Sequence, residues 1–178
     1  AGSLLDAGPA RESIHRYWDA VYPADNRAAE GDRVNQLHDT IVQTVQRYRP
    51  QGGTGAWGTF LSGGTDSSTV AGMIREASGQ RAATYSIGFD AQGYDEMAYA
   101  RLAAKAYDCE HHEYYVTPED VLSTLPMIAA AFPEPFGNSS AAAAYHCARI
   151  AREKGLRLLM AGDGGDELFG GNERYAKQ

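Results

Sequence analysis

One short segment, Ser62-Gly63-Gly64-Thr65-Asp66-Ser67, limits most strongly what this chain can fold into. A short apolar run from Trp57 to Leu61 precedes it, and apolar residues at helical spacing follow between Val70 and Ala77. The segment therefore joins a predicted strand to a predicted helix. Its paired glycines permit positive φ and a close approach of the backbone to an anion, and the helix that follows directs its positive end at the same point. The pattern predicts a phosphate-binding loop.

The acid inside this loop, Asp66, indicates a metal ion. A carboxylate is favourable beside a phosphate when Mg²⁺ lies between them, because Mg²⁺ prefers one or two carboxylates together with phosphate oxygens. The hydroxyls of Ser62, Ser67 and Ser68 are further candidate donors. The alternative is a Gly-rich turn in which Asp66 only caps the helix. No Gly-Lys-Ser/Thr follows, so the loop is not a Walker P-loop, and cleavage of the β–γ bond of ATP is disfavoured.

Predicted helices and strands alternate through the remainder of the chain. This alternation favours an α/β fold in which a parallel sheet carries helices on both faces, with ligands beyond the carboxyl ends of the strands. The predicted elements are a helix from Asp32 to Tyr48, a strand from Ala82 to Phe89, a helix capped by Asp95 and ending near Tyr107, a strand from His111 to Val116, a helix capped by Thr117 and ending near Ala131, a helix capped by Ser140 and ending at Lys154, and a strand from Arg157 to Met160.

Composition and charge narrow the classes of partner. We assign residues 1–31 to a linker or arm and residues 32–178 to one domain. The formal net charge of −7 opposes general binding to nucleic acid or to anionic lipid. No apolar run has the length of a membrane helix. Cys109 and Cys147 are far apart in the sequence, which favours a reduced, cytoplasmic protein, and neither is expected near the phosphate loop.

A second loop, residues 161–171, gathers acids at the end of the last predicted strand. Asp163, Asp166 and Glu167 fall within five positions of the run Ala-Gly-Asp-Gly-Gly-Asp-Glu-Leu-Phe-Gly-Gly. So many acids at a strand end call for a counter-charge, although a solvated acidic turn is the plainer interpretation. The spacing does not match a calcium-binding EF-hand loop.

These segments carry a family resemblance. Residues 60–68 resemble the pyrophosphate-binding loop of the N-type ATP pyrophosphatases, whose pattern is SGGxDS. Taken with the second loop and four further segments, the region from Asp32 to Tyr175 is similar to the synthetase domain of glutamine-hydrolysing asparagine synthetases, which have the adenine nucleotide alpha hydrolase-like (PP-loop) fold. The further segments are Ser86-Ile87-Gly88-Phe89, Tyr94-Asp95-Glu96, Glu110-His111-His112-Glu113 and Glu134 to Ser140.

The resemblance implies roles for residues of this chain. Asp66 and Asp166 correspond to Mg²⁺ ligands, and Asp163 corresponds to an acid that acts near the amide-forming step. Glu134, Asn138 and Ser139 either contact substrate or nucleotide or cap their loop. The implied ATP contacts are Leu61, Ser62, Gly63, Gly64, Ser67, Ile87, Ala161 and Gly162, where Ala161 replaces a frequent serine.

The implied activity is that of a ligase which adenylates a carboxylate with ATP and Mg²⁺, releases pyrophosphate, and then lets ammonia displace AMP. In the parent family the acceptor is the β-carboxylate of L-aspartate, and ammonia comes from a glutaminase domain. That domain and a C-terminal Lys-bearing segment are absent, so the chain is expected to be a fragment, with a homodimer as one assembly. The alternatives are the same chemistry on another acid, as in a β-lactam synthetase or a polysaccharide-modifying amidotransferase, and a non-catalytic ATP-binding module.

Overall fold

The computed structural model describes residues 2–8, 11–19, 21, 29–50, 57–90, 95–134, 137–138 and 140–172. The chain divides into two compact units, residues 1–36 and 37–178. The first contains an antiparallel hairpin of β1 (Ser3–Gly8) and β2 (Arg11–Arg16), in which Ser3 pairs with Arg16. No strands were predicted here, because the segment lacks a regular apolar alternation. The assignment of residues 1–31 as a linker or arm stays a prediction.

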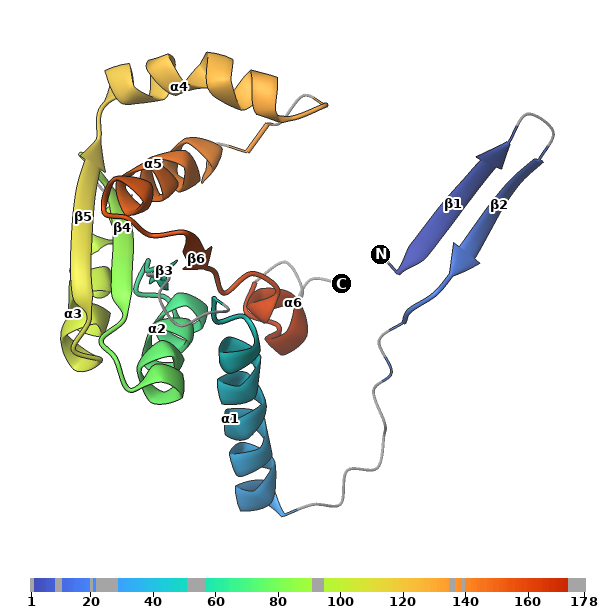
Figure 1. Ribbon diagram of the computed structural model, residues 1–178, viewed down its shortest axis with the longest axis horizontal. Helices are drawn as coiled ribbons and strands as arrows, with labels where there is room; N and C mark the ends of the chain where they lie inside the picture. Colours follow the sequence, from blue (N-terminus) through green and yellow to red (C-terminus); the bar gives the residue numbers. More distant parts are fainter. Residues whose placement is uncertain are drawn as a thin grey trace. The chain divides into compact units, whose positions relative to one another are not determined.

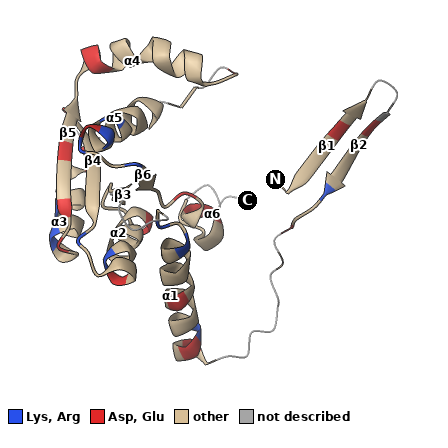
Figure 2. Ribbon diagram, viewed as in Figure 1, with Lys and Arg blue, Asp and Glu red and all other residues tan. Residues whose placement is uncertain are grey.

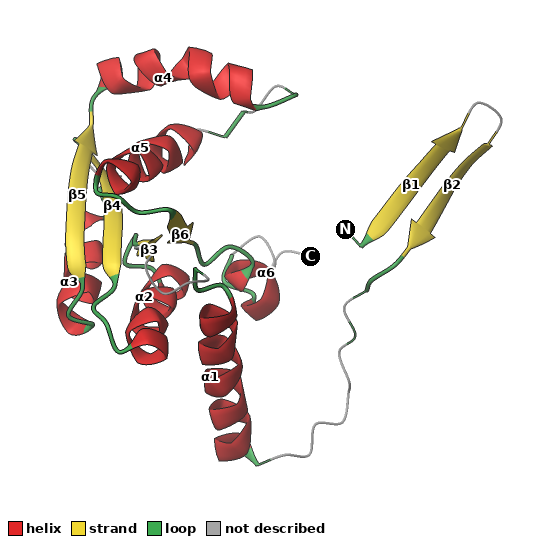
Figure 3. Ribbon diagram, in the orientation of Figure 1, coloured by secondary structure: helices red, strands yellow, loops and turns green. Residues whose placement is uncertain are grey.

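The second unit is built on a parallel sheet, as predicted (Figure 1, Figure 3). Its strand order is β5-β4-β3-β6, and every neighbouring pair is parallel. The bounds are β3 (Trp57–Phe60), β4 (Ala83–Phe89), β5 (Glu110–Val116) and β6 (Leu158–Met160). The chain steps outward from β3 to β4 and β5 and then returns to place β6 on the other side of β3. The carboxyl ends of β3 and β6 therefore flank the point where strand order reverses, which is where such sheets bind ligands.

Helices cover both faces of this sheet. On one face, α2 (Thr65–Ser78) packs on β3, and α3 (Met97–Ala106) packs on β4 and β5. Val45 of α1 (Glu30–Arg47) joins the same apolar cluster. On the other face, α5 (Ser140–Glu153) contacts β4 and β5, and α4 (Pro118–Ala131) packs on α5. None of the helices in the described part of the chain is long and apolar enough to cross a bilayer.

The sheet is buried on both faces, which explains its mixed side chains. Tyr85 of β4 packs with Cys147 and Ala151 of α5, while the neighbouring Thr84 is fully buried on the opposite side of the strand. The Thr84 hydroxyl lies 2.9 Å from Nδ1 of His111. The Thr59 hydroxyl, also fully buried, donates to the carbonyl of Met160 at 3.0 Å. These buried hydroxyls are satisfied by hydrogen bonds to the adjacent strands, so they do not weaken the sheet.

Helix starts agree with the predictions at one place and differ at two. Thr117 caps α4 in a capping box with Asp120, and Pro118 is the first helical residue, as predicted. Glu96, and not the predicted Asp95, occupies the N-cap position of α3. The Asp95 carboxylate instead accepts a hydrogen bond from the Met97 N–H.

Ser140 is the first helical residue of α5 and not its cap, which corrects the second prediction. The side-chain oxygen of Asn138 accepts from the Ser140 N–H at 3.0 Å and from its hydroxyl at 2.8 Å. Asn and Ser are about equally good at capping a helix, so the sequence alone does not show whether Asn138 or Ser140 accepts the hydrogen bond.

Candidate nucleotide-binding site

The predicted phosphate loop leaves β3 at a position that β4 fixes from the side. The Leu61 N–H donates to the carbonyl of Tyr85 at 2.9 Å, and the hydroxyl of Ser86 donates to the carbonyl of Leu61. Leu61 itself is 2% exposed. The residue that precedes the loop is thus held by two hydrogen bonds and by packing, so the loop starts from a fixed point.

Two serine hydroxyls close the loop on itself. The Ser67 hydroxyl accepts from the Ser62 N–H at 3.2 Å and donates to the carbonyl of Gly64 at 3.3 Å. The Ser62 hydroxyl accepts from the Gly64 N–H at 3.3 Å and lies 3.0 Å from the Ser67 hydroxyl. Either hydroxyl can be the donor between the two. This ring fixes the curvature of the loop without a ligand.

The first turn of α2 provides free donors beside this ring. Gly64 is the N-cap residue, with extended backbone angles and no side-chain cap hydrogen bond. The first N–H groups of a helix have no partner within the helix, and without a capping side chain they remain available to an anion. The loop and the helix start together form the kind of anion site that the sequence predicted.

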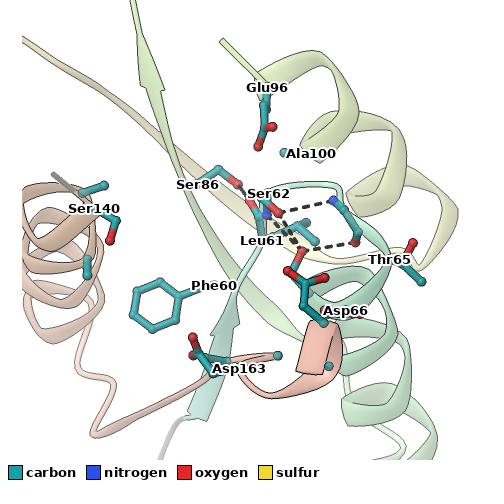
Figure 4. Close-up of a pocket in the computed structure, with 18 of the residues that line it drawn as sticks. Phe60, Leu61, Ser62, Thr65, Asp66, Ser86, Glu96, Ala100, Ser140 and Asp163 are labelled. Carbon is teal, nitrogen blue, oxygen red and sulfur yellow. Dashed lines mark hydrogen bonds between the residues drawn. The ribbon is translucent and has the colours of Figure 1, made fainter. Parts of the chain in front are cut away.

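A cavity of about 920 Å³ opens in front of the loop (Figure 4). It lies at the carboxyl ends of β3, β4 and β6 and extends to α5 and to the start of α3. Every predicted ATP contact except Gly63 lines it, as do Asp66, Asp163 and Asp166. The structure therefore brings together residues that are up to about a hundred positions apart in the sequence. The volume falls within the range usual for sites that hold a small molecule.

Gly63 turns away from the cavity and toward α3. Its φ is +87°, and a Cβ built there would lie 2.6 Å from Cβ of Tyr99 and 2.5 Å from the nitrogen of Ala100. Only glycine fits this backbone angle and this approach. Ser68 also lies outside the cavity lining, and its buried hydroxyl has no hydrogen-bond partner among the described residues, so it is not placed to bind phosphate from this side.

The second loop packs directly on Asp66. A Cβ at Gly162 would lie 2.7 Å from Cβ of Asp66, and one at Gly165 would overlap the Asp66 carboxylate. The glycines of this loop thus admit Asp66 between the two loops. Residues 165–169 form a short helix, α6 (Gly165–Phe169), which the sequence analysis treated as loop. Acids mark both α6 and the first turn of α2 in Figure 2.

The cavity is acidic. Among the described residues that line it there are five carboxylates and no lysine, arginine or histidine; the acids are Asp66, Glu96, Asp163, Asp166 and Glu167. Within the described parts of the chain, no hydrogen bond or ion pair engages the side chains of Asp66, Asp163 or Asp166. Carboxylates that face a cavity without cationic partners are a donor set that suits a divalent cation. Asp66 and Asp166, on the two apposed loops, fit the predicted Mg²⁺ in this respect.

Several lining residues were not predicted. They are Phe60, Tyr85, Glu96, Ser140 and Cys147, among others. The expectation that neither cysteine lies near the site was wrong for Cys147, since α5 folds back over the sheet. Burial raises the pKa of the Cys147 thiol to about 12, so it stays protonated and is no nucleophile. Glu134 does not line the cavity, Asn138 caps α5, and Ser139 lies outside the described residues.

Solved structures share this fold. A glutamine-dependent NAD⁺ synthetase from Acinetobacter baumannii, in complex with ADP, superimposes with a TM-score of 0.56 and 14% identity, over 89% of this chain and 30% of that one. An NMN synthetase from Francisella tularensis gives a TM-score of 0.51 and 15% identity, over 70% and 52%. Together with the SGGxDS loop at the switch point, the fold places the chain in the class of PP-loop, adenine nucleotide alpha hydrolase-like proteins.

The asparagine synthase family model matches residues 37–178, and the chain belongs to that family. A putative asparagine synthetase [glutamine-hydrolyzing] 2 from Methanocaldococcus jannaschii is 40% identical over 161 residues, which cover 87% of this chain and 29% of the relative. Asparagine synthetase [glutamine-hydrolyzing] 1 from Bacillus subtilis is 36% identical over 146 residues, which cover 82% and 22%. The chain thus spans less than a third of the length of these relatives.

Proposed function

We propose that this chain is the ATP-dependent part of an amide-forming synthetase. ATP binds in the 920 Å³ cavity with its phosphates at residues 62–67, and a substrate carboxylate attacks the α-phosphorus. Pyrophosphate leaves, and ammonia then displaces AMP from the acyl-adenylate to give the amide. The observation that carries this proposal is the convergence of the phosphate loop and the acidic loop on one cavity at the strand-order reversal.

Each loop has a defined share of this chemistry. The N–H groups at the start of α2 and the Ser62 and Ser67 hydroxyls hold the phosphates, while Leu61, Ile87, Ala161 and Gly162 contact the adenosine. Asp66 and Asp166 would hold Mg²⁺, which would supply positive charge to offset that of the departing pyrophosphate. Asp163 accepts a proton from the attacking ammonia. These assignments rest on cavity lining and on the absence of competing partners for the three carboxylates within the described residues.

The acidity of the cavity supports a strict cation requirement. Five carboxylates would repel a bare triphosphate, and the described lining supplies no basic side chain to offset them. Free ATP should therefore bind far more weakly than Mg·ATP.

The acceptor is proposed to be L-aspartate, by family membership, with asparagine as product. Ammonia would come from a glutamine-hydrolysing domain outside this chain. The setting is proposed to be the cytoplasm, where the thiols of Cys109 and Cys147 remain reduced. The proposed homodimer can be examined by light scattering on a sizing column.

Calorimetry and a pyrophosphate assay test the function in sequence. The chain is titrated with ATP in Mg²⁺ and in chelator, and the full-length parent is then supplied with ATP, ammonia and a panel of acids that includes L-aspartate. We expect binding only with Mg²⁺, and pyrophosphate release that depends on aspartate. Release with another acid alone would indicate a relative with a different acceptor. Binding without release would indicate an ATP-binding module, and no binding under either condition would contradict the proposal.

A further inference from the structure

The first turn of α3 packs against the back of the phosphate loop. A Cβ built at Gly63 would lie 2.5 Å from the nitrogen of Ala100 and 2.6 Å from Cβ of Tyr99, so the loop and the helix are in backbone contact. Ala100 is 1% exposed and lies beside the loop in Figure 4. Glu96, at the N-cap of the same helix, lines the cavity. The position of this helix start therefore limits where the backbone of residues 62–64 can lie.

A tyrosine of β5 fastens this helix start to the sheet. The Tyr115 hydroxyl donates to Oδ2 of Asp95 at 3.1 Å, and Oδ1 of the same carboxylate accepts from the Met97 N–H at 3.2 Å. Partial burial, followed by the hydrogen bond to Asp95, raises the pKa of the Tyr115 phenol, so the phenol remains the donor. One carboxylate thus joins β5 to α3 directly before the turn that contacts the phosphate loop.

A glycine of β4 makes room for the tyrosine ring. Gly88 pairs in register with Tyr115. A Cβ at Gly88 would lie 2.5 Å from Cε1 and 2.8 Å from Cδ1 of this ring, so the ring lies over the glycine, and a larger residue there would displace it. Gly88 and Asp95 belong to two of the segments that carry the family resemblance, yet neither is among the described residues that line the cavity.

Other contacts hold α3 on the sheet independently of Tyr115. Arg101 forms an ion pair with Glu113 of β5, and the side chain of Met97 is 1% exposed in the apolar core. Loss of the Tyr115 hydroxyl should therefore let the start of α3 shift without releasing the helix. The effect on the phosphate loop can then be separated from unfolding.

We propose that Tyr115 and Asp95 are positioning residues for the phosphate loop, which hold the first turn of α3 against Gly63 and thereby fix the backbone that receives the phosphates of ATP. Their role rests on the proposed function, because it concerns the affinity of this loop for phosphate. A binding site keeps its geometry only when the residues behind it are themselves held in place.

Tyr115→Phe tests this role, because it removes the hydroxyl and keeps the ring over Gly88. Calorimetry should show affinities for Mg·ATP and for Mg·pyrophosphate about three- to tenfold lower, a fraction of what one hydrogen bond to a charged group contributes. Asp95→Ala should lower them at least as much. Asp95→Asn should restore affinity close to that of the parent, because its amide oxygen can accept from the Met97 N–H and its NH₂ group can donate to the phenol oxygen.

Tyr114→Phe is the matched control. The Tyr114 hydroxyl donates to Oδ2 of Asp120 at 3.0 Å, so this variant also loses one hydrogen bond from a phenol to a carboxylate, at the next position of the same strand. The Tyr114 ring stacks on His146 of α5, and Tyr114 is not among the described residues that line the cavity. Its affinities for both ligands should equal those of the parent.

Backbone amide NMR of the ligand-free chain distinguishes this role from the proposed function. We expect the Gly63 and Gly64 signals to shift in Tyr115→Phe and to stay in place in Tyr114→Phe. If the parent binds neither Mg·ATP nor Mg·pyrophosphate, the proposed function fails, and these signals alone decide whether Tyr115 positions the loop. Unmoved signals, unchanged affinity in a parent that binds, or equal losses of affinity in the two variants would overturn the role of Tyr115.

Discussion

At the scale of single residues, the proposed ATP site depends most on Asp66, which lies between the two loops and among the glycines that admit it. The second loop packs on its side chain, but its carboxylate has no hydrogen bond or ion pair within the described residues. A carboxylate placed at a cavity without a polar partner is available to a ligand. If this ligand is Mg²⁺, a substitution at Asp66 should lower the affinity for Mg·ATP without lowering the stability of the fold.

Asp66→Asn should weaken Mg·ATP binding and leave the fold intact. We expect affinity, measured by calorimetry, to fall at least about tenfold, the lower end of the cost of losing even an outer partner of a metal. The melting temperature should change little, since the amide replaces a carboxylate that contacts no partner in the described chain. Asp163→Asn is the comparison: it should keep Mg·ATP affinity but lower amide formation. Unchanged affinity in Asp66→Asn would refute the metal assignment.

Alanine substitutions at Gly63 and Gly79 distinguish the cost of backbone strain from the cost of steric overlap. Gly79, the C-cap of α2, also has a positive φ, of +68°, but a Cβ there would meet no atom within 4 Å. Gly79→Ala should cost ~1 kcal/mol of unfolding free energy, the ordinary cost of a left-handed L-residue. Gly63→Ala should cost at least ~2 kcal/mol, because overlap with the α3 backbone adds to that strain. Urea unfolding measures the loss of unfolding free energy in each variant. Equal losses would show that α3 moves aside to accommodate the added methyl group.

At the scale of secondary structure, an ion pair joins α3 to β5. Arg101 binds Glu113 with two parallel hydrogen bonds, Nε to Oε1 at 2.9 Å and Nη2 to Oε2 at 2.6 Å. The hydrogen bond from Arg101 lowers the pKa of Glu113 below its usual value. A carboxyl group whose pKa is depressed in the folded state stabilises the protein above its unfolded pKa, and the effect is lost as pH falls through the folded value.

Arg101→Gln should therefore flatten the acid side of the stability profile. We expect the parent to lose stability more steeply than the variant as the pH falls from about 5 to below the ordinary Glu pKa of about 4.3, and the two to converge in stronger acid. Thermal unfolding at a series of pH values measures this. Arg152→Gln on α5 removes the same charge where no acid is paired within the described residues, and its profile should parallel that of the parent. A parallel profile for Arg101→Gln would contradict the prediction.

Local patterns were sufficient to predict most helices and strands of the second unit. The apolar runs at Trp57 and Ala82 and the Thr117-Pro118 start of α4 each act within a few residues, and the structure has these elements close to the predicted bounds. The hairpin β1–β2 and the short α6 were missed. The hairpin has few apolar alternations, and α6 lies in a glycine-rich segment whose sequence favours turns.

The cavity lining was harder to predict, because it depends on which elements pack together. The two loops carry recognisable sequences, so their residues were named in advance. Glu96, Ser140 and Cys147 reach the cavity only because α3 and α5 lie over the sheet in particular registers. Helical periodicity shows that Cys147 lies on one face of its helix, but it does not show which strand that face covers.

At the scale of the whole molecule, charge is distributed unevenly between two ends of one sheet. The cavity at the carboxyl ends of the strands is lined by five acids and by no described basic side chain, whereas Arg81, Lys154 and Glu110 line a second cavity at the amino ends. The negative charge of the chain is thus gathered in part at one end of the sheet.

The pairing of β3 with β6 bears on how the protein folds. Thr59 bonds to Met160, 101 positions away in the sequence, whereas β3 and β4 are joined through the single helix α2. Contacts between distant segments form slowly, because a long intervening chain must first be ordered. The acidic loop follows β6 directly and reaches the phosphate loop only after this pairing. Capture of nucleotide would therefore be among the last properties to appear during refolding, and could serve as a kinetic reporter of its final step.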